Sequence, residues 1–188
     1  MPDKNLSIEE LFNLALQEHK KNNFNIAKKY YEKILESNPN EVGIYNNLGA
    51  ISIKLEEYEK AVYCFKKAIS LDSNNTIFYN NLGVALHKLD RMDEAINIYK
   101  KAISIKNEFA EAFNNLGNAM FETNKLKDSI PYFEKAIKIK PNFAMAYLNL
   151  GRAYQDLGNK NKALEYFQES IKIQPNPVFQ DHSPLTPQ

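Results

Sequence analysis

Residues 45–49 read YNNLG, and this short stretch decides how the rest of the chain is interpreted. The same letters recur at residues 79–83, and FNNLG stands at residues 113–117, so the pattern returns every 34 residues (79 − 45 = 113 − 79 = 34). Asparagine and glycine are poor helix formers, so local helix stability does not explain their recurrence. A fixed interval of this length indicates a repeat protein in which each interval is one structural unit.

Extended outward, this register covers residues 8–177 and divides them into five units. The units are 8–41, 42–75, 76–109, 110–143 and 144–177, preceded by a lead-in at 1–7 and followed by a proline-rich tail at 178–188. Large and small residues recur within a unit at spacings of three, four and seven, which is the helical signature. Each unit is therefore expected to form two helices joined by a polar turn, and the tail is expected to be extended or disordered.

The unit boundaries carry capping and packing signals. Ser7 and Glu10 form an S-x-x-E capping box before the first helix. Asparagine is a good N-cap residue, and we expect it to cap helices at Asn40, Asn74, Asn142 and Asn176. The glycine at position 8 of a unit, such as Gly83, is expected to face the small residue at position 20, so that the two backbones approach closely.

Composition excludes several functional classes. The formal net charge is +1, so no strong overall field attracts nucleic acid or an acidic membrane surface. Cys64 is the only cysteine, which excludes a disulfide within the chain and a cysteine-based zinc site. No apolar stretch is long enough to serve as a signal core or to cross a bilayer. These features predict a cytoplasmic protein that binds neither nucleic acid nor membranes.

The repeating residues resemble the tetratricopeptide repeat (TPR) family. The aromatic–x–x–Leu–Gly start, the small residue at position 20, the aromatic at position 24 and the proline near the unit's end all occur, although Leu11 and Ala15 depart from this pattern in the first unit. The resemblance implies an all-α fold, a right-handed α-solenoid whose first helices line a concave groove. The repeats are most similar to those of the TPR domain of the O-linked N-acetylglucosamine transferase.

An asparagine occupies position 6 in all five units. A helix turns about 100° per residue, which places positions 2, 6, 9 and 13 opposite the packed face and, in this family, in the groove. A carboxamide can pair with both the C=O and the N–H of a peptide group, so stacked amides are suited to hold an extended peptide. The alternative is that these asparagines are merely solvated or inherited by duplication. This asparagine ladder consists of Asn13, Asn47, Asn81, Asn115 and Asn149.

The other candidate groove residues differ between the two halves of the chain. Position 13 is basic in the first three units, at Lys20, Lys54 and Lys88, and acidic in the last two, at Glu122 and Asp156. A partner with acidic residues is therefore expected over the first three units. The remaining candidates lie at the groove edge or on its floor: Asn46, Asn80, Asn114, Asn118 and Arg152.

No constellation of residues predicts catalysis, a metal or a cofactor. His19 and His87 are two units apart, the glycines form no phosphate loop, and Cys64 has no neighbouring base in the sequence. The chain is therefore expected to be a non-catalytic scaffold that binds a protein or peptide partner. Two alternatives remain open, a solenoid that self-associates through its end faces or tail, and the substrate-recruiting TPR domain of a larger enzyme such as a glycosyltransferase. Val178, Phe179 and Leu185 are the tail residues expected to dock in a groove, if any do.

Overall fold

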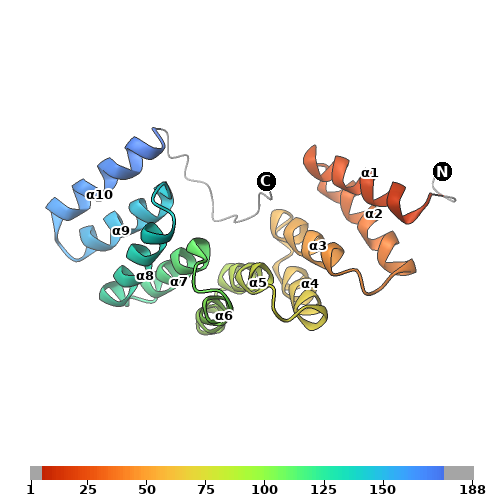
Figure 1. Ribbon diagram of the computed structural model, residues 1–188, viewed down its shortest axis with the longest axis horizontal. Coiled ribbons are helices and arrows are strands. Elements are labelled where there is room, and N and C mark those ends of the chain that lie inside the picture. The colour runs from red at the N-terminus through yellow and green to blue at the C-terminus, as the bar shows by residue number, and fades with distance from the viewer. Residues whose placement is uncertain (1–5, 176–188) are drawn as a thin grey trace.

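The computed structural model describes residues 6–175, which form ten α-helices and no strand. The predicted all-α repeat fold is confirmed, and the tail expectations, including Asn176, fall outside the described residues. The helices follow one another along an open arc, with α1 and α2 at one end and α9 and α10 at the other (Figure 1). Their bounds are α1 Ile8–Lys20, α2 Phe24–Ser37, α3 Val42–Lys54, α4 Tyr58–Leu71, α5 Thr76–Lys88, α6 Met92–Ile105, α7 Ala110–Glu122, α8 Leu126–Ile139, α9 Ala144–Asp156 and α10 Lys160–Ile173.

Two kinds of contact build the arc. Each odd-numbered helix packs against the following even-numbered helix, and that helix then packs against the first helix of the next unit. In addition, α3, α5, α7 and α9 contact one another in sequence, so neighbouring first helices lie side by side. Each of the five units is thus a helical hairpin, and the surface formed by the first helices is continuous from α3 to α9.

The glycine at position 8 makes room for an aromatic ring. A Cβ atom at Gly83 would lie 2.4 Å from Cε1 of Tyr99, and one at Gly49 would lie 2.6 Å from Cε1 of Phe65. Tyr99 and Phe65 are themselves buried. The expectation that the glycine faces the small residue at position 20 is therefore wrong for Gly83. The aromatic at position 24 occupies the space, because its flat ring lies directly against the glycine backbone.

The capping predictions have mixed outcomes. The capping box is confirmed, since the Glu10 amide donates to Oγ of Ser7 at 3.2 Å and the Ser7 amide donates to Oε2 of Glu10 at 2.8 Å. The N-caps predicted at Asn40, Asn74 and Asn142 are wrong, because α3, α5 and α9 begin later and have Glu41, Asn75 and Phe143 at those positions. The predicted asparagines lie one residue too early, in the turns between units.

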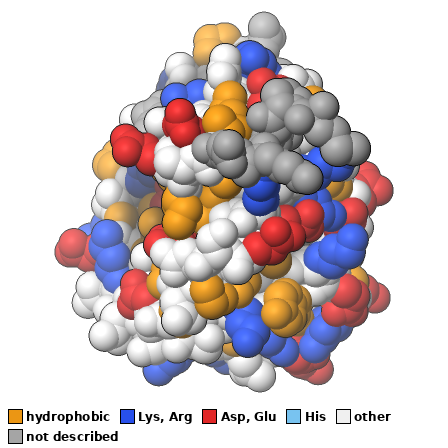
Figure 2. Space-filling model, turned by 90° about the vertical axis from the view of Figure 1, so that its right-hand side faces the viewer, with side chains coloured by type: hydrophobic (Ala, Val, Ile, Leu, Met, Phe, Trp, Pro, Cys, Tyr) orange, Lys and Arg blue, Asp and Glu red, His pale blue; other side chains and the backbone are white. Residues whose placement is uncertain are grey.

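The two ends of the arc differ in character. On α10, the side chains of Leu164 and Ile171 are 59% and 51% exposed, whereas Val62 and Ile96, which share the position of Leu164 in their own units, are 5% exposed. The next unit covers those positions in the interior of the array, and α10 has no following unit within the described residues. Figure 2 views the opposite end, where acidic and basic side chains are interspersed with small apolar patches.

Candidate functional site

The asparagine ladder is a hydrogen-bonded network that joins neighbouring units. Three of its members donate through Nδ2 to the Oδ1 atom of the position-5 asparagine in the preceding unit, a residue 35 positions earlier. The three bonds are Asn81 to Asn46 at 3.1 Å, Asn115 to Asn80 at 3.0 Å, and Asn149 to Asn114 at 3.1 Å. Both asparagines of the YNNLG motif thus take part in one repeated contact between units.

The first junction departs from this pattern because Phe12 stands where the later units have an asparagine. Here Nδ2 of Asn47 donates instead to the phenolic oxygen of Tyr31, 3.3 Å away. Asn13, the first member of the ladder, is exposed on α1. The network therefore begins at the second unit and runs to the fifth.

Several predicted groove residues are more buried than expected. Asn81 and Asn149 are only 1% and 2% exposed, and Asn80, Asn114 and Asn118 are also buried. The prediction that position 6 points away from all packing is wrong for Asn81 and Asn149. The rotation angle of one helix does not include the adjacent first helix of the next unit, which covers much of this surface.

The network leaves hydrogen-bonding capacity on the amides. A carboxamide has two N–H donors and an oxygen acceptor, and each ladder bond uses one N–H of the position-6 residue. Within residues 6–175, the buried Oδ1 atom of Asn149 has no hydrogen-bond partner, which is unfavourable by about 1–3 kcal/mol. The capacity that a partner could reach lies on Asn47 and Asn115, whose side chains are half-buried.

The position-13 residues form a row of charges that changes sign along the molecule. Lys20 and Lys54 are exposed and Lys88 is half-buried, whereas Glu122 is exposed. Burial, together with the charge of Lys54 on the next unit, lowers the pKa of His19. The row thus has cationic groups on the first three units and anionic groups on the last two.

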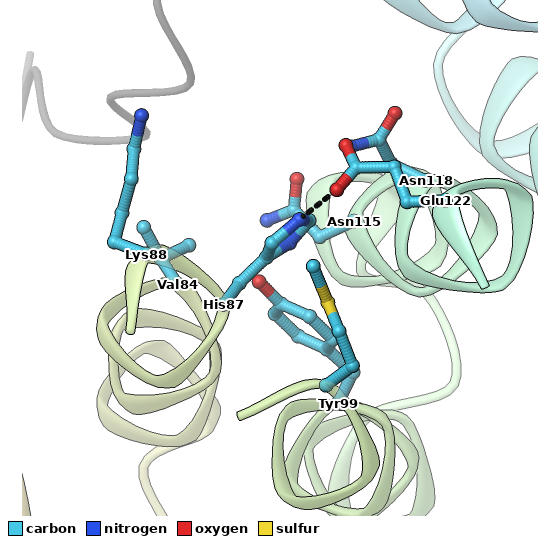
Figure 3. Close-up of a pocket in the computed structure, with 8 residues that line it drawn as sticks. Val84, His87, Lys88, Tyr99, Asn115, Asn118 and Glu122 are labelled. Carbon is cyan, nitrogen blue, oxygen red and sulfur yellow. Dashed lines mark hydrogen bonds and ion pairs between the residues drawn. The ribbon is translucent and has the colours of Figure 1, made fainter. Parts of the chain in front are cut away.

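A cavity of about 250 Å³ lies where the third and fourth units meet (Figure 3). Nε2 of His87 lies 2.7 Å from Oε2 of Glu122, and Nδ2 of Asn118 donates to Oε1 of Glu122 at 2.7 Å. The two units are therefore tied together across the cavity mouth. The lining residues are Val84, His87, Lys88, Met92, Tyr99, Asn115, Asn118 and Glu122.

The sequence does not predict this cavity. Four of its lining residues are nevertheless among the residues predicted to line the groove or to carry its charges: Lys88, Asn115, Asn118 and Glu122. Tyr99 stands at the aromatic position 24 of its unit, which the repeat pattern explains as packing, and the pattern gives Met92 no role. One signal was present in the sequence, because position 17 is methionine in the third unit and aromatic in the first two, at Phe24 and Tyr58.

At the junction of the fourth and fifth units, the predicted groove residue Arg152 lies with Cζ 5.4 Å from the ring centroid of Phe121.

The remaining reactive groups show no catalytic arrangement in the described part of the chain. Cys64 is buried in the apolar cluster formed by the first two units, and burial raises the pKa of its thiol to about 11. Residues 6–175 contain no group of three or more His, Cys, Asp and Glu side chains that could hold a metal ion. None of the helices in that range combines the length and apolarity needed to cross a membrane.

Comparisons with known proteins agree with this architecture. Sequence profiles described as "TPR repeat" match residues 51–90, 89–124 and 117–158, and profiles described as "Tetratricopeptide repeat" match residues 11–41, 30–63 and 144–177. A search of curated protein sequences gave no match.

Solved structures similar to this chain include a crystal structure of MamA protein, with 27% identity and a TM-score of 0.76, covering 96% of this chain and 98% of that one. YrrB, described as a TPR protein with an unusual peptide-binding site, is 26% identical with a TM-score of 0.69, covering 92% of this chain and 89% of YrrB. Pseudomonas aeruginosa PilF shares the fold at 23% identity and a TM-score of 0.78, covering 88% of this chain and 75% of PilF.

Proposed function

Because this chain belongs to the tetratricopeptide repeat family, a fold that serves protein–protein interaction, we propose that it is a non-catalytic scaffold whose inner surface binds an extended peptide through the asparagine ladder. The observation that carries the proposal is the network of amides on the first helices. Its members are held in register by the bonds between units, and the side chains of Asn47 and Asn115 remain partly exposed. The similarity to YrrB, which is described as having a peptide-binding site, supports the same conclusion.

The ladder fits recognition of a peptide backbone. Amides that are already hydrogen-bonded to one another lose little conformational freedom on binding, and this preorganisation favours affinity. Asn47 and Asn115, which are half-buried, retain an N–H or a lone pair with which to meet a backbone C=O or N–H. Recognition of this kind makes little demand on the partner's side chains, so the charged row supplies the selectivity.

The charged row favours acidic residues of the partner over the first three units. Lys20 and Lys54 are exposed on α1 and α3, and Glu122 and Asp156 follow on α7 and α9. A peptide with acidic residues on one side and basic residues on the other would match both halves. Complementary charges of this kind set orientation and association rate, and like charges brought together weaken the binding of a wrong partner.

Calorimetry with two synthetic peptides tests the charged row. We expect an acetylated Asp-Ser-Gly repeat of twelve residues to bind and the corresponding Lys-Ser-Gly repeat to bind at least tenfold more weakly, a difference of about 1.4 kcal/mol. The double variant Lys20→Glu, Lys54→Glu should remove this preference. The matched control is Lys100→Glu, Lys101→Glu, which makes the same change in charge at exposed sites on α6. Equal binding of both peptides to the unmodified protein would contradict the proposed selectivity.

The ladder is tested by changing the peptide, since Asn→Ala variants would also break the bonds between units. N-methylation of alternate amides in the acidic peptide removes N–H donors while keeping every side chain. We expect the N-methylated peptide to bind at least tenfold more weakly, because it cannot donate to acceptors such as Oδ1 of Asn115, whose side chain is half-buried. Unchanged affinity would rule out backbone recognition and leave only the charged row.

A second candidate function rests on the exposed apolar face of α10. Leu164 and Ile171 are about two helical turns apart along one side of this helix. Both are more exposed than their equivalents in the second and third units, which are buried or half-buried. At the other end α1 carries Glu10 and Gln17 where the later units have apolar residues, which disfavours head-to-tail stacking. Self-association would then pair α10 with α10 of another copy. Light scattering should show a concentration-dependent dimer that Leu164→Glu abolishes, and a monomer at all concentrations excludes this function.

A further inference from the structure

We propose that the cavity at the junction of the third and fourth units binds one aromatic side chain of the partner, and so selects the peptide. The inference rests on the proposed peptide-binding function and adds the class of side chain that is recognised. The inner wall of the cavity is apolar, made by Val84, Met92 and the ring of Tyr99, of which Val84 and Tyr99 are buried. The mouth is polar and carries His87, Asn118 and Glu122 (Figure 3).

The other units indicate what fills this space. At position 17 the first two units have Phe24 and Tyr58, whereas the third has Met92, which is unbranched and flexible. In the first unit, positions 12 and 17 are in ring contact, with the centroids of His19 and Phe24 5.9 Å apart and their planes at 77°. In the third unit the same two positions, His87 and Met92, both line the cavity.

The following junction is filled in another way. There position 12 is Phe121, and the guanidinium of Arg152 lies over its ring. At the cavity the equivalent residues are His87 and Asn118, which both contact Glu122 instead. Aromatic rings of the chain itself therefore pack at the other units: Phe24 against His19, Tyr58 against the core, and Phe121 against Arg152. The junction of the third and fourth units has Met92 where the first two units have an aromatic residue. An aromatic side chain of the partner would fill the space that the missing ring leaves.

The size and polarity of the cavity suit such a side chain. A volume of about 250 Å³ is below the ~300–1,000 Å³ of pockets that hold whole drug-sized ligands, so one side chain is the fitting occupant. Both oxygens of Glu122 are already hydrogen-bonded, to His87 and to Asn118. An aromatic ring in the cavity can place its positive edge toward this carboxylate at the mouth. The face of the same ring can then pack against the apolar wall. Burial of a ring is expected to raise the affinity by about tenfold to hundredfold.

Peptide pairs that differ at one residue test the cavity. The acidic twelve-residue peptide is made with Phe or Ala replacing one central Ser, and the Phe form is expected to bind at least tenfold more tightly to the unmodified full chain. Met92→Tyr places in the third unit the residue that the second unit has at Tyr58, so it should fold and fill the cavity. In this variant the ratio of the two affinities should fall below about twofold. The matched control, Leu126→Tyr, changes the same position in the fourth unit and should keep the tenfold ratio.

A side-chain analogue separates failure of the cavity from failure of the groove. Titration of the unmodified protein with 4-methylphenol should shift the NMR signals of Val84 and Met92, and Met92→Tyr should abolish the shift at Val84. Absence of the shift, or equal affinity of the Phe and Ala peptides, would overturn the aromatic site even where the groove binds both peptides. If neither peptide binds but 4-methylphenol shifts these signals, the cavity stands and the proposed groove function fails.

The chain's own tail offers a competing aromatic residue, Phe179, which lies outside the described residues. The full-length variant Phe179→Ala distinguishes it from a separate partner. A Phe peptide that binds this variant more tightly than the unmodified chain would show that the cavity accepts an aromatic ring and that the tail competes for it. Equal affinity for the two proteins supports a separate partner as the occupant.

Discussion

Nδ2 of Asn115 donates a hydrogen bond to Oδ1 of Asn80, 3.0 Å away, and thereby joins the fourth unit to the third. The equivalent bonds of Asn81 and Asn149 join the units on either side. Because Asn80 is buried, the bond lies where water does not easily replace it. Asparagine, which is poor in isolated helices, is thus favoured here by a contact that exists only when units stack.

The first prediction concerns the stability of this network. Asn81→Ala should lower the free energy of unfolding by about 1–3 kcal/mol, because it leaves the Oδ1 atom of Asn46 without its donor. A double-mutant cycle with Asn46→Ala, measured by urea denaturation, should give a coupling energy of about 0.5–1.5 kcal/mol. Asn13→Ala is the control, since Asn13 is exposed and should change stability by less than ~0.5 kcal/mol. Additive effects of the two variants would contradict the role assigned to the bond.

How far sequence predicts this molecule depends on whether a feature lies within one unit or between units. The helical hairpin follows from the spacing of Tyr45, Leu48 and Gly49, since helical periodicity is a property of the local sequence. The bond from Asn81 to Asn46 could not be derived in this way, because it depends on how far apart two adjacent first helices lie. The cavity at Met92 is similar, since its presence depends on what neighbouring side chains fail to fill.

The second prediction concerns the glycine at position 8. Gly83→Leu should destabilise the protein by about 1–3 kcal/mol or more, because even a Cβ atom there would lie 2.4 Å from the buried ring of Tyr99. Gly43→Ala is a matched control on α3, where an added Cβ meets nothing within 4 Å. That control should be neutral or stabilising by up to about 1 kcal/mol, since alanine is the better helix former. Thermal unfolding compares the two, and equal effects would refute the packing explanation.

The third prediction uses the turns between the two helices of each unit. Every turn has one residue with positive φ at the same position of its unit. In the fifth unit this residue is Gly158, and in the first four it is Asn22, Glu56, Asp90 and Asn124. Asparagine and aspartate tolerate this conformation better than other residues with side chains.

Glu56 is therefore the most strained of these turn residues, with φ of 59° and an exposed side chain. Glu56→Gly should raise the free energy of unfolding by about 0.5–1 kcal/mol, and Asn124→Gly should raise it by less. Gly158→Ala should do the opposite, because it places a Cβ at φ of 79°. The urea midpoints of these three variants, compared with that of the unmodified chain, test the prediction. A larger gain in stability for Asn124→Gly than for Glu56→Gly would contradict this account.

The fourth prediction is a loss of stability at alkaline pH that begins at Cys64. Burial raises the pKa of this thiol from 9.0 to about 11, so between these values the folded chain retains a proton that the unfolded chain has released. The contribution of Cys64 to the free energy of unfolding is therefore fully present below pH 9 and falls as pH rises toward 11, by about 1.4 kcal/mol for each pKa unit.

Burial likewise raises the pKa of Tyr31 from 10.0 to about 12, which extends the loss of stability to higher pH. Urea denaturation at pH 8, 10 and 11 should show a flatter dependence for Cys64→Ala than for the unmodified chain, whereas Tyr31→Phe should reduce the loss of stability only above pH 10. An unchanged slope in Cys64→Ala would mean that the thiol is solvated in the folded protein.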